Sequence, residues 1–254
     1  MRVGLIGAGN MARALARGWG DPVLCSDGGS GAAQALAQEL GGEAVDNVAV
    51  ASQADVVVLC HKPAQLASVA AEIGAYARAI ASVLGATPIA ALREAYPDAP
   101  LVRVMPNTPV EVRRGVLCYC AGPGVDARFE AELLGLFERL GTVVRIDERL
   151  MDPATAVMGV GPAYHALMAE AQIDAAVRHG LSAALAGRLV VETMAGSAAL
   201  LSRRRCDTLS VRREVTSPGG STARGLAALE RGGVRAAFQS AIDAVLSGSG
   251  GGER

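Results

Sequence analysis

The sequence predicts a chain in two parts, an α/β part with a parallel sheet followed by an all-helical part. Strand-like apolar runs alternate with helical patterns between residues 2 and 146, which is the order typical of a parallel sheet. Residues 55–60 are almost continuously apolar, as expected of a strand that is buried on both faces. After Asp147 no strand-like run appears, and apolar residues repeat at helical spacing instead.

A glycine-rich turn follows the first predicted strand, residues 2–6, and leads into a helix that ends near Trp19. The turn reads Gly7-Ala8-Gly9-Asn10-Met11-Ala12, which is G-x-G-x-x-A between a strand and a helix. Gly7 makes the turn, Gly9 lets a pyrophosphate approach the backbone, and Ala12 lets helix and strand pack closely. The pattern predicts an N-terminal Rossmann-type domain whose residues 7–11 contact a dinucleotide.

The second predicted strand, residues 23–25, ends at Ser26 and Asp27. Asp27 follows Gly7 by about 20 residues, where an acidic residue hydrogen-bonds the ribose hydroxyls of the cofactor. A carboxylate there accepts the 2′-hydroxyl of NADH and repels the 2′-phosphate of NADPH. The predicted cofactor is therefore NAD(P)H with a lean towards NADH, which the neighbouring Ser26 weakens.

The remaining elements of the α/β part follow from the same alternation. Strands are expected at residues 43–45, 55–60, 80–84, 101–105, 115–121 and 142–146, and helices at residues 31–40, 89–96 and 127–140 and from Pro63 onwards. Asn47 is expected to cap a brief helix. Lys62, the only lysine among the 24 basic residues, follows a strand at the edge where open α/β sheets bind ligands. Pro106 and Pro109 are expected to hold Asn107 in an extended loop, either structural or ligand-binding.

The helical part contains a second candidate site, at residues 215–222. Helices are expected at residues 162–178, 183–201 and 234–246, and a further helix is expected to start at Ser217 as N-cap with Pro218 in its first position. Two glycines let the backbone approach a ligand, and the free N–H groups of the first helical turn point towards it. This predicts a small-anion site with hydroxyls beside it, or alternatively a plain capped helix.

Composition excludes several classes of function. The net charge of −1 gives no electrostatic reason to expect nucleic acid or an anionic membrane surface as partner. No uncharged stretch reaches the roughly 20 apolar residues that span a bilayer, so a cytoplasmic protein without membrane contact is expected. Five cysteines without a C-x-x-C motif and three unpaired histidines predict no metal site. Residues 247–254 are expected to form a disordered tail.

Taken together, these motifs resemble the pyrroline-5-carboxylate reductase family, the last enzyme of proline biosynthesis, over nearly the whole chain. The resemblance rests on residues 7–11, 61–63, 103–109, 159–164 and 216–222. It implies a Rossmann NAD(P)H-binding domain over residues 1–150 and a helical dimerisation and substrate domain over residues 151–254. The implied partners are a cyclic imino acid and a second copy of the chain, with further assembly of dimers left open.

The resemblance also implies residue roles. Ser217, Gly219 and Gly220, with Ser221 beside them, hold the substrate carboxylate, and Thr222 contacts the ring nitrogen. Asn47, Lys62 and Asn107 contact the cofactor. The implied reaction is reduction of 1-pyrroline-5-carboxylate to proline.

Two alternatives remain open at this point, an imine reductase for a different cyclic imino acid and a dinucleotide-binding regulator without turnover. The family usually has Gly-Ser-Gly before Pro-Ala-Tyr and a valine or similar residue before Lys-Pro. This chain has Val160 and His61 at those places.

Overall fold

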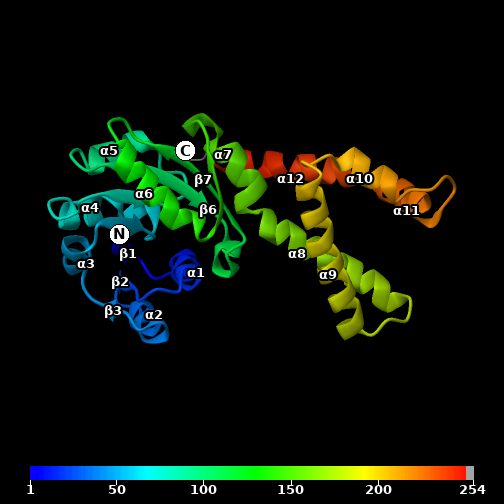
Figure 1. The fold of residues 1–254 in the computed structure, drawn as a ribbon, viewed down its shortest axis with the longest axis horizontal. Coiled ribbons are helices and arrows are strands. Elements are labelled where there is room, and N and C mark those ends of the chain that lie inside the picture. Colours follow the sequence, from blue (N-terminus) through cyan, green and yellow to red (C-terminus); the bar gives the residue numbers. More distant parts are fainter. Residues whose placement is uncertain (250–254) are drawn as a thin grey trace. The chain divides into compact units, whose positions relative to one another are not determined.

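The structure, a computed structural model, describes residues 1–249 of the chain (Figure 1). It divides into two compact units, Met1–Pro162 and Ala163–Arg254. All strands lie in the first unit, and the described part of the second unit contains helices and their connections. The predicted α/β part followed by an all-helical part is therefore confirmed.

One eight-stranded sheet organises the first unit, in the order β3-β2-β1-β4-β5-β6-β7-β8. Strands β1 to β6 pair in parallel, β7 is antiparallel to β6, and β8 is parallel to β7. The strand order reverses on the two sides of β1, which creates the crevice at carboxyl strand ends where such sheets bind ligands. The strands are β1 (Val3–Ile6), β2 (Leu24–Ser26), β3 (Glu43–Ala44), β4 (Val56–Leu59), β5 (Ile80–Ser82), β6 (Leu101–Pro106), β7 (Gly115–Ala121) and β8 (Gly141–Arg145).

Helices cover both faces of this sheet, because successive strand residues point to opposite sides. Val56 and Val58 belong to the apolar core beneath α1 (Asn10–Trp19), α2 (Ala32–Leu40) and α6 (Ala127–Glu138). Val57 and Leu59 belong to the core beneath α3 (Asn47–Gln53), α4 (Leu66–Ile73) and α5 (Ile89–Ala95). The near-continuous apolar run in the sequence is thus explained by burial of β4 on both faces.

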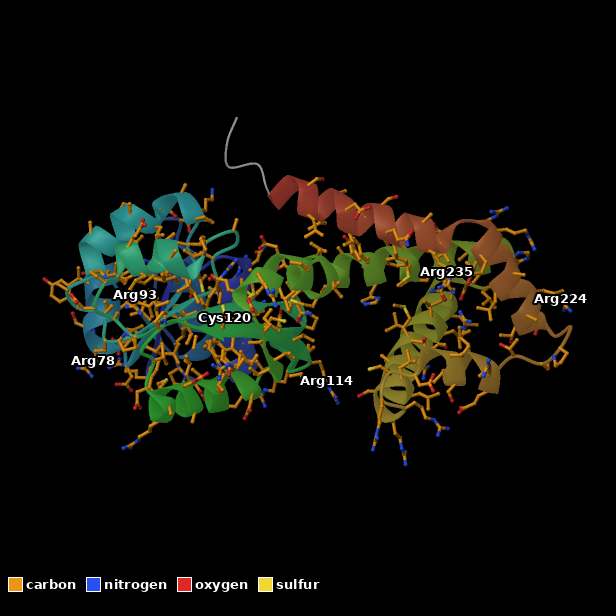
Figure 2. The ribbon with its side chains drawn as sticks, turned by 90° about the horizontal axis from the view of Figure 1, so that it is seen from above. Arg78, Arg93, Arg114, Cys120, Arg224 and Arg235 are labelled. Atoms are coloured by element: carbon orange, nitrogen blue, oxygen red, sulfur yellow. The ribbon has the colours of Figure 1, made fainter. Side chains whose placement is uncertain are left out.

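A third layer lies over β6 and β7 and is formed by residues 148–160, called the connector below. It comprises η3 (Glu148–Leu150), α7 (Met151–Ala154) and a π-helical turn, η4 (Thr155–Gly159). Met151 packs there with Met105, Cys118 and Cys120 of the two strands, and Figure 2 shows Cys120 within the sheet. The connector leads into α8 (Gly161–Arg178), the first long helix after the sheet.

The helical unit continues with α9 (Ala183–Arg203), α10 (Thr208–Glu214), α11 (Ser221–Arg231) and α12 (Val234–Ser249). Ser182 caps α9, accepting from the N–H of Leu185 at 3.3 Å. In the described part of this unit, Ala186 is the one hydrophobic residue that is fully buried. The unit therefore has almost no core of its own.

Several local expectations are wrong. Asp46, and not Asn47, caps α3, accepting from the N–H of Ala49 at 2.7 Å. Asn107 itself is extended, as expected, but a 3₁₀-helix, η2 (Thr108–Val112), follows it in place of a loop. The first turn of η2 tolerates Pro109 because the missing N–H is not needed there.

The expected start of α11 is also wrong, because that helix begins at Ser221 with Gly220 as N-cap. Residues 247–249 belong to α12, whereas the remainder of the predicted tail lies outside the described residues.

Helix α9 is the described element that bears on membrane spans. Among the described helices it alone is long and apolar enough to cross a membrane by length and composition. Arg188 and Glu192 interrupt its apolar residues, and most of its side chains are exposed.

Candidate functional site

The glycine-rich turn joins three strand ends at the carboxyl edge of the sheet. Gly7 has a φ of 97°, and a Cβ on it would lie 2.7 Å from backbone atoms of Cys60 and His61 beyond β4. Its N–H donates to the carbonyl of Ser26, at the end of β2, at 3.0 Å. Only glycine combines a positive φ with the absence of a Cβ, so Gly7 lets the turn keep the ends of β1, β2 and β4 together.

The turn presents an open helix N-terminus. Gly9 is the N-cap of α1 and has no side-chain cap, so the first N–H groups of the helix are not capped by a side chain. A Cβ on Gly9 would meet nothing within 4 Å, so there is free space directly before these groups. Ala8 is buried, Met11 packs on the core, and exposed Asn10 accepts from Arg13 at 2.5 Å. Free space before free N–H groups fits a dinucleotide pyrophosphate.

Asp27 is turned back into its own loop. Its carboxylate accepts from the N–H of Gly29 at 2.8 Å, the hydroxyl of Ser30 at 2.8 Å and the N–H of Ala33 at 3.0 Å. The bond from Ala33, the hydroxyl of Ser30 and the other loop amides lower the pKa of Asp27 to about 2. Asp27 therefore stays ionised and closes the loop onto the first turn of α2.

A hydrogen-bonded chain of three side chains stands beside this loop. The hydroxyl of buried Ser26 donates to Oδ1 of Asn47 at 2.6 Å, and Nδ2 of Asn47 donates to Oε2 of Glu72 at 2.7 Å. The three residues come from the end of β2, the start of α3 and the last turn of α4. Two predicted cofactor contacts, Ser26 and Asn47, are thus brought together, and Glu72 joins them.

Lys62 and His61 follow the carboxyl end of β4. Lys62 is exposed, and its N–H donates to the side chain of Gln65 at 3.1 Å where η1 (Pro63–Gln65) begins. Nδ1 of His61 lies 2.9 Å from the carbonyl of Lys62, while its Nε2 is buried without a partner. Burial lowers the pKa of His61, and the contact with that carbonyl opposes part of the effect. His61 is therefore held as neutral imidazole.

Asn107 connects the end of β6 to the connector. Its Nδ2 donates to the carbonyl of Met158 in the π-helical turn at 3.0 Å, and its Oδ1 accepts from the N–H of Val116 at 2.8 Å. The side chain is buried, and one N–H of its amide remains for a further acceptor. Its position at a carboxyl strand end agrees with a cofactor contact. Its hydrogen bonds define a structural role, which is to join β6 to β7 and to the connector.

The second candidate site lies in the helical unit, where the loop of residues 216–220 precedes α11. Gly219 has a φ of 68°, and Gly220 N–H donates to the carbonyl of Ser217 at 3.0 Å, which makes a turn. A Cβ on Gly220 would collide with Oγ of Ser217, so this hydroxyl lies at the start of the helix. Arg224, labelled in Figure 2, donates to the carbonyl of Gly219 at 2.6 Å and braces the turn.

Helix α11 has no side-chain cap, so its first N–H groups are available to an anion. Ser221 and Thr222 are its first two residues, which places their hydroxyls in the same first turn. The loop therefore offers amides and hydroxyls together. This is the donor set that a small carboxylate requires.

The structure thus groups the predicted site residues in two places. One group lies in the first unit, at the carboxyl ends of strands or at the start of α3. It comprises the glycine turn, Ser26, Asp27, Asn47, Lys62 and Asn107. Residues 217 and 219–222 form one loop and helix start in the second. Sequence reasoning missed Glu72 and Met158, because an exposed helical glutamate and a backbone carbonyl carry no motif.

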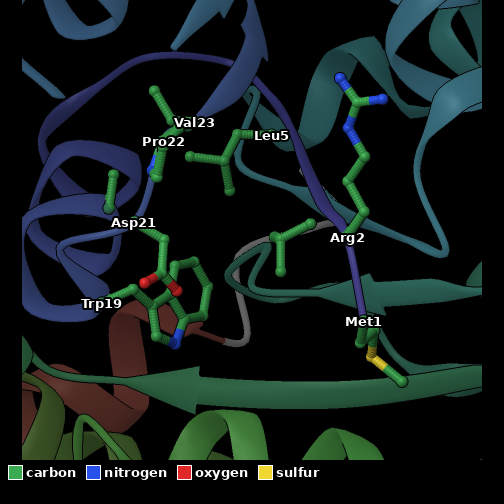
Figure 3. Close-up of a pocket in the computed structure, with 9 residues that line it drawn as sticks. Met1, Arg2, Leu5, Trp19, Asp21, Pro22 and Val23 are labelled. Atoms are coloured by element: carbon green, nitrogen blue, oxygen red, sulfur yellow. The ribbon is translucent and has the colours of Figure 1, made fainter. Parts of the chain in front are cut away.

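A separate pocket of about 100 Å³ lies at the opposite edge of the sheet (Figure 3). Leu5 and Trp19 form part of its wall, and Arg2 and Asp21 stand at the same pocket. The pocket borders the start of β1, away from the carboxyl strand ends, and so is not the predicted dinucleotide site. Between residues 1 and 249, no group of three or more metal-ligating side chains occurs.

The mostly parallel sheet, the glycine turn and the uncapped start of α1 define a dinucleotide-binding domain of the Rossmann class. Two family profiles match the chain: "NADP oxidoreductase coenzyme F420-dependent" over residues 2–86 and "Pyrroline-5-carboxylate reductase dimerisation" over residues 148–250.

Curated relatives and solved structures agree with these profiles. The pyrroline-5-carboxylate reductase of Synechocystis is 37% identical over 78% of this chain and 75% of its own, and that of Pseudomonas aeruginosa is 34% identical over 96% and 93%. The crystal structure of a Plasmodium falciparum pyrroline carboxylate reductase with NADP bound is 30% identical, with a TM-score of 0.87 over 98% of this chain and 97% of that one. The chain belongs to the pyrroline-5-carboxylate reductase family.

Proposed function

We propose that the chain reduces 1-pyrroline-5-carboxylate to L-proline, with hydride from NAD(P)H added to the cyclic C=N bond. The observation that carries the proposal is the start of α11, where uncapped amides and Thr222 lie in the first turn and the hydroxyl of Ser217 lies next to the N-cap residue Gly220. Family membership supports it, since the relatives above are pyrroline carboxylate reductases and one was solved with NADP bound.

The proposed roles follow from hydrogen-bonding capacity. The amides at the start of α11 and the hydroxyls of Ser217 and Ser221 hold the carboxylate at the positive end of the helix. Thr222 orients the ring nitrogen, which becomes an amine as hydride arrives at the neighbouring carbon. Bound NAD(P)H supplies the hydride, and the glycine turn holds its pyrophosphate. A hydroxyl is a poor acid, so Thr222 orients the nitrogen or relays a proton from water.

The proposal is tested by following dihydronicotinamide oxidation with five- and six-membered cyclic imino acids. Ser217→Ala is expected to raise KM for the imine, and Thr222→Ala to lower kcat about ten- to a hundredfold, since one hydrogen bond in the transition state is worth about 1–3 kcal/mol. Thr208→Ala, at the exposed start of α10, is the matched control and leaves both constants unchanged. Full kcat and KM in a folded Thr222→Ala variant would contradict the role.

The same assay separates the alternatives. Turnover of a six-membered imine alone would favour an imine reductase for another substrate. Val160, which stands where the family usually has serine, is the reason to consider this alternative. Dinucleotide binding without any turnover would favour a regulator.

We further propose that the chain works as a homodimer formed through its helical unit. On α9, Leu185 and Leu189 lie one turn apart and are 45% and 50% exposed, and Ala186 is the only buried hydrophobic residue in the described part of the unit. Apolar helix faces of this kind are covered in a stable protein. The match to a dimerisation profile over residues 148–250 supports a second copy as the cover.

Light scattering with Leu189→Asp tests the dimer, and Val112→Asp, an exposed position of the first unit, is its control. A loss of dimer in the first variant alone is expected, and twice the dimer mass in the parent would reveal dimers of dimers. A fully active monomer at micromolar concentration would contradict the proposal.

With α9 covered in this way, we propose a cytoplasmic protein. Recovery of the protein in the membrane fraction would contradict that localisation.

A further inference from the structure

The inference concerns the cofactor's adenosine ribose and rests on the proposed function. We propose that Glu72 is a specificity-determining residue that makes this site favour NADH over NADPH. The basis is the hydrogen-bonded chain Ser26–Asn47–Glu72 next to the loop closed by Asp27.

Glu72 fixes the orientation of the Asn47 amide. An ionised carboxylate only accepts hydrogen bonds, so the Nδ2 end of Asn47 faces Glu72 and the Oδ1 end faces the hydroxyl of Ser26. Oδ1 is therefore already engaged, and one N–H of Nδ2 remains. The amide can offer a ligand this single donor.

The rest of this surface is rich in acceptors and negative charge. Asp27 and Glu72 are both carboxylates, and the three loop donors that Asp27 accepts leave part of its Oδ1 free. Asp46 adds a third carboxylate directly before Asn47. Residues 23–33, 43–53 and 63–73, which form this surface, contain no lysine or arginine; Lys62 borders the last of them.

This chemistry suits a ribose diol and opposes a phosphate. Hydroxyls donate to carboxylates, whereas a 2′-phosphate is a multiply charged group that only accepts and requires donors or cations. Like charges within one site repel each other at a few ångströms even in water. Asp27 keeps its charge while its oxygens bond to its own loop. Glu72 is the carboxylate that is hydrogen-bonded to Asn47, so Glu72 adds to the repulsion of a 2′-phosphate at that amide.

The test measures dissociation constants for NADH and NADPH by fluorescence, without substrate, on the parent protein, Glu72→Gln and Glu138→Gln. The parent is expected to bind NADH at least tenfold more tightly than NADPH. Glu72→Gln is expected to shift this ratio about tenfold towards NADPH, mainly through NADPH. Glu138→Gln, which removes the same charge from an exposed position of α6, leaves the ratio unchanged.

Measurement at high ionic strength tests whether the charge of Glu72, and not the shape of the site, sets the ratio of the two affinities. At 1 M salt, where the screening length is about 3 Å, the ratio in the parent is expected to approach that of Glu72→Gln. An equal or tighter parent affinity for NADPH overturns the inference, as does a ratio insensitive to Glu72→Gln. A selective loss of NADPH affinity in Lys62→Ala also overturns it, because Lys62 would then hold the phosphate. Binding of neither dinucleotide is the distinct outcome that contradicts the proposed function itself.

Discussion

The side-chain amide of Asn107 donates to the backbone carbonyl of Met158 at 3.0 Å, and so ties the carboxyl end of β6 to the π-helical turn of the connector. The same amide accepts from the N–H of Val116, at 2.8 Å, in the neighbouring strand β7. One buried side chain therefore fixes three segments where the sheet gives way to helices.

Replacing Asn107 should loosen this junction. Asn107→Ala loses both bonds and leaves a buried carbonyl and N–H unpaired, so the free energy of unfolding should fall by about 2–4 kcal/mol. Asn107→Asp keeps the acceptor for Val116 but sets a carboxylate against the carbonyl of Met158, and so is also expected to destabilise. Urea unfolding measures both variants. Unchanged stability in the two would contradict the structural role.

Gly18 makes the close contact between α1 and the 3₁₀-helix after Asn107. A Cβ on Gly18 would collide with the carbonyl oxygen of Val110 and lie 2.6 Å from the side chain of Leu140. Gly18→Ala should therefore destabilise by about 1–3 kcal/mol through overpacking. Gly135→Ala in α6 is the matched control, because its Cβ meets nothing within 4 Å and alanine favours the helix by about 0.5–1 kcal/mol. The two substitutions should have opposite signs in thermal unfolding.

Arg103 is an almost buried guanidinium held by the connector. Its side chain is 5% exposed, and it pairs with Glu148 at 3.2 Å and Asp152 at 3.7 Å. The same Oε1 of Glu148 accepts from the N–H of Ile89 at the start of α5, at 2.6 Å.

Glu148→Ala removes both bonds and leaves Arg103 with its more distant partner, so a loss of about 2–4 kcal/mol in unfolding free energy is expected. Glu132→Ala breaks the exposed pair with Arg128 on α6 and should change stability by only about 0.3–0.5 kcal/mol. Equal effects of the two substitutions would show that burial does not strengthen the Arg103 pair.

His61 predicts a pH dependence of stability. Burial lowers its pKa in the folded state below the ordinary value of 6.5, so the unfolded chain binds the proton more readily. The stability that this group contributes is present above pH 6.5 and is lost as pH falls through the folded pKa.

His61→Phe removes that protonation, so the variant should lose less stability than the parent between pH 7.5 and about 5.5. The exposed His179→Phe is the control and should follow the parent. Parallel curves for all three proteins would contradict the lowered pKa of the half-buried His61.

The sequence predicted the parts of the fold that depend on local pattern. The glycine turn and the order of strands and helices are set by neighbouring residues, and both are present. The start of α11 was predicted at Ser217 because a serine before a proline is a common helix start. Gly219 instead adopts a left-handed conformation outside the helix, so the helix begins at Ser221.

Tertiary contacts account for what the sequence did not predict. The π-helical turn is held by Asn107, roughly fifty residues away. Glu148, which follows β8 in the sequence, accepts from the N–H of Ile89 at the start of α5. Asp27 was predicted as a ribose ligand from its spacing to Gly7, but spacing does not reveal that its loop supplies three donors to it. Glu72 joins Asn47 only because α3 and α4 pack side by side.

The position of Lys62 has a consequence for chemical labelling. Because every other basic side chain of this sequence is a guanidinium, amine-directed reagents find a single ε-amine, and it is exposed at the carboxyl end of β4. One acylation event would thus report on the ligand edge of the sheet, with no background from other lysines. A peptide map, which separates acylated Lys62 from the acylated α-amine of Met1, would report how far bound dinucleotide protects the carboxyl end of β4.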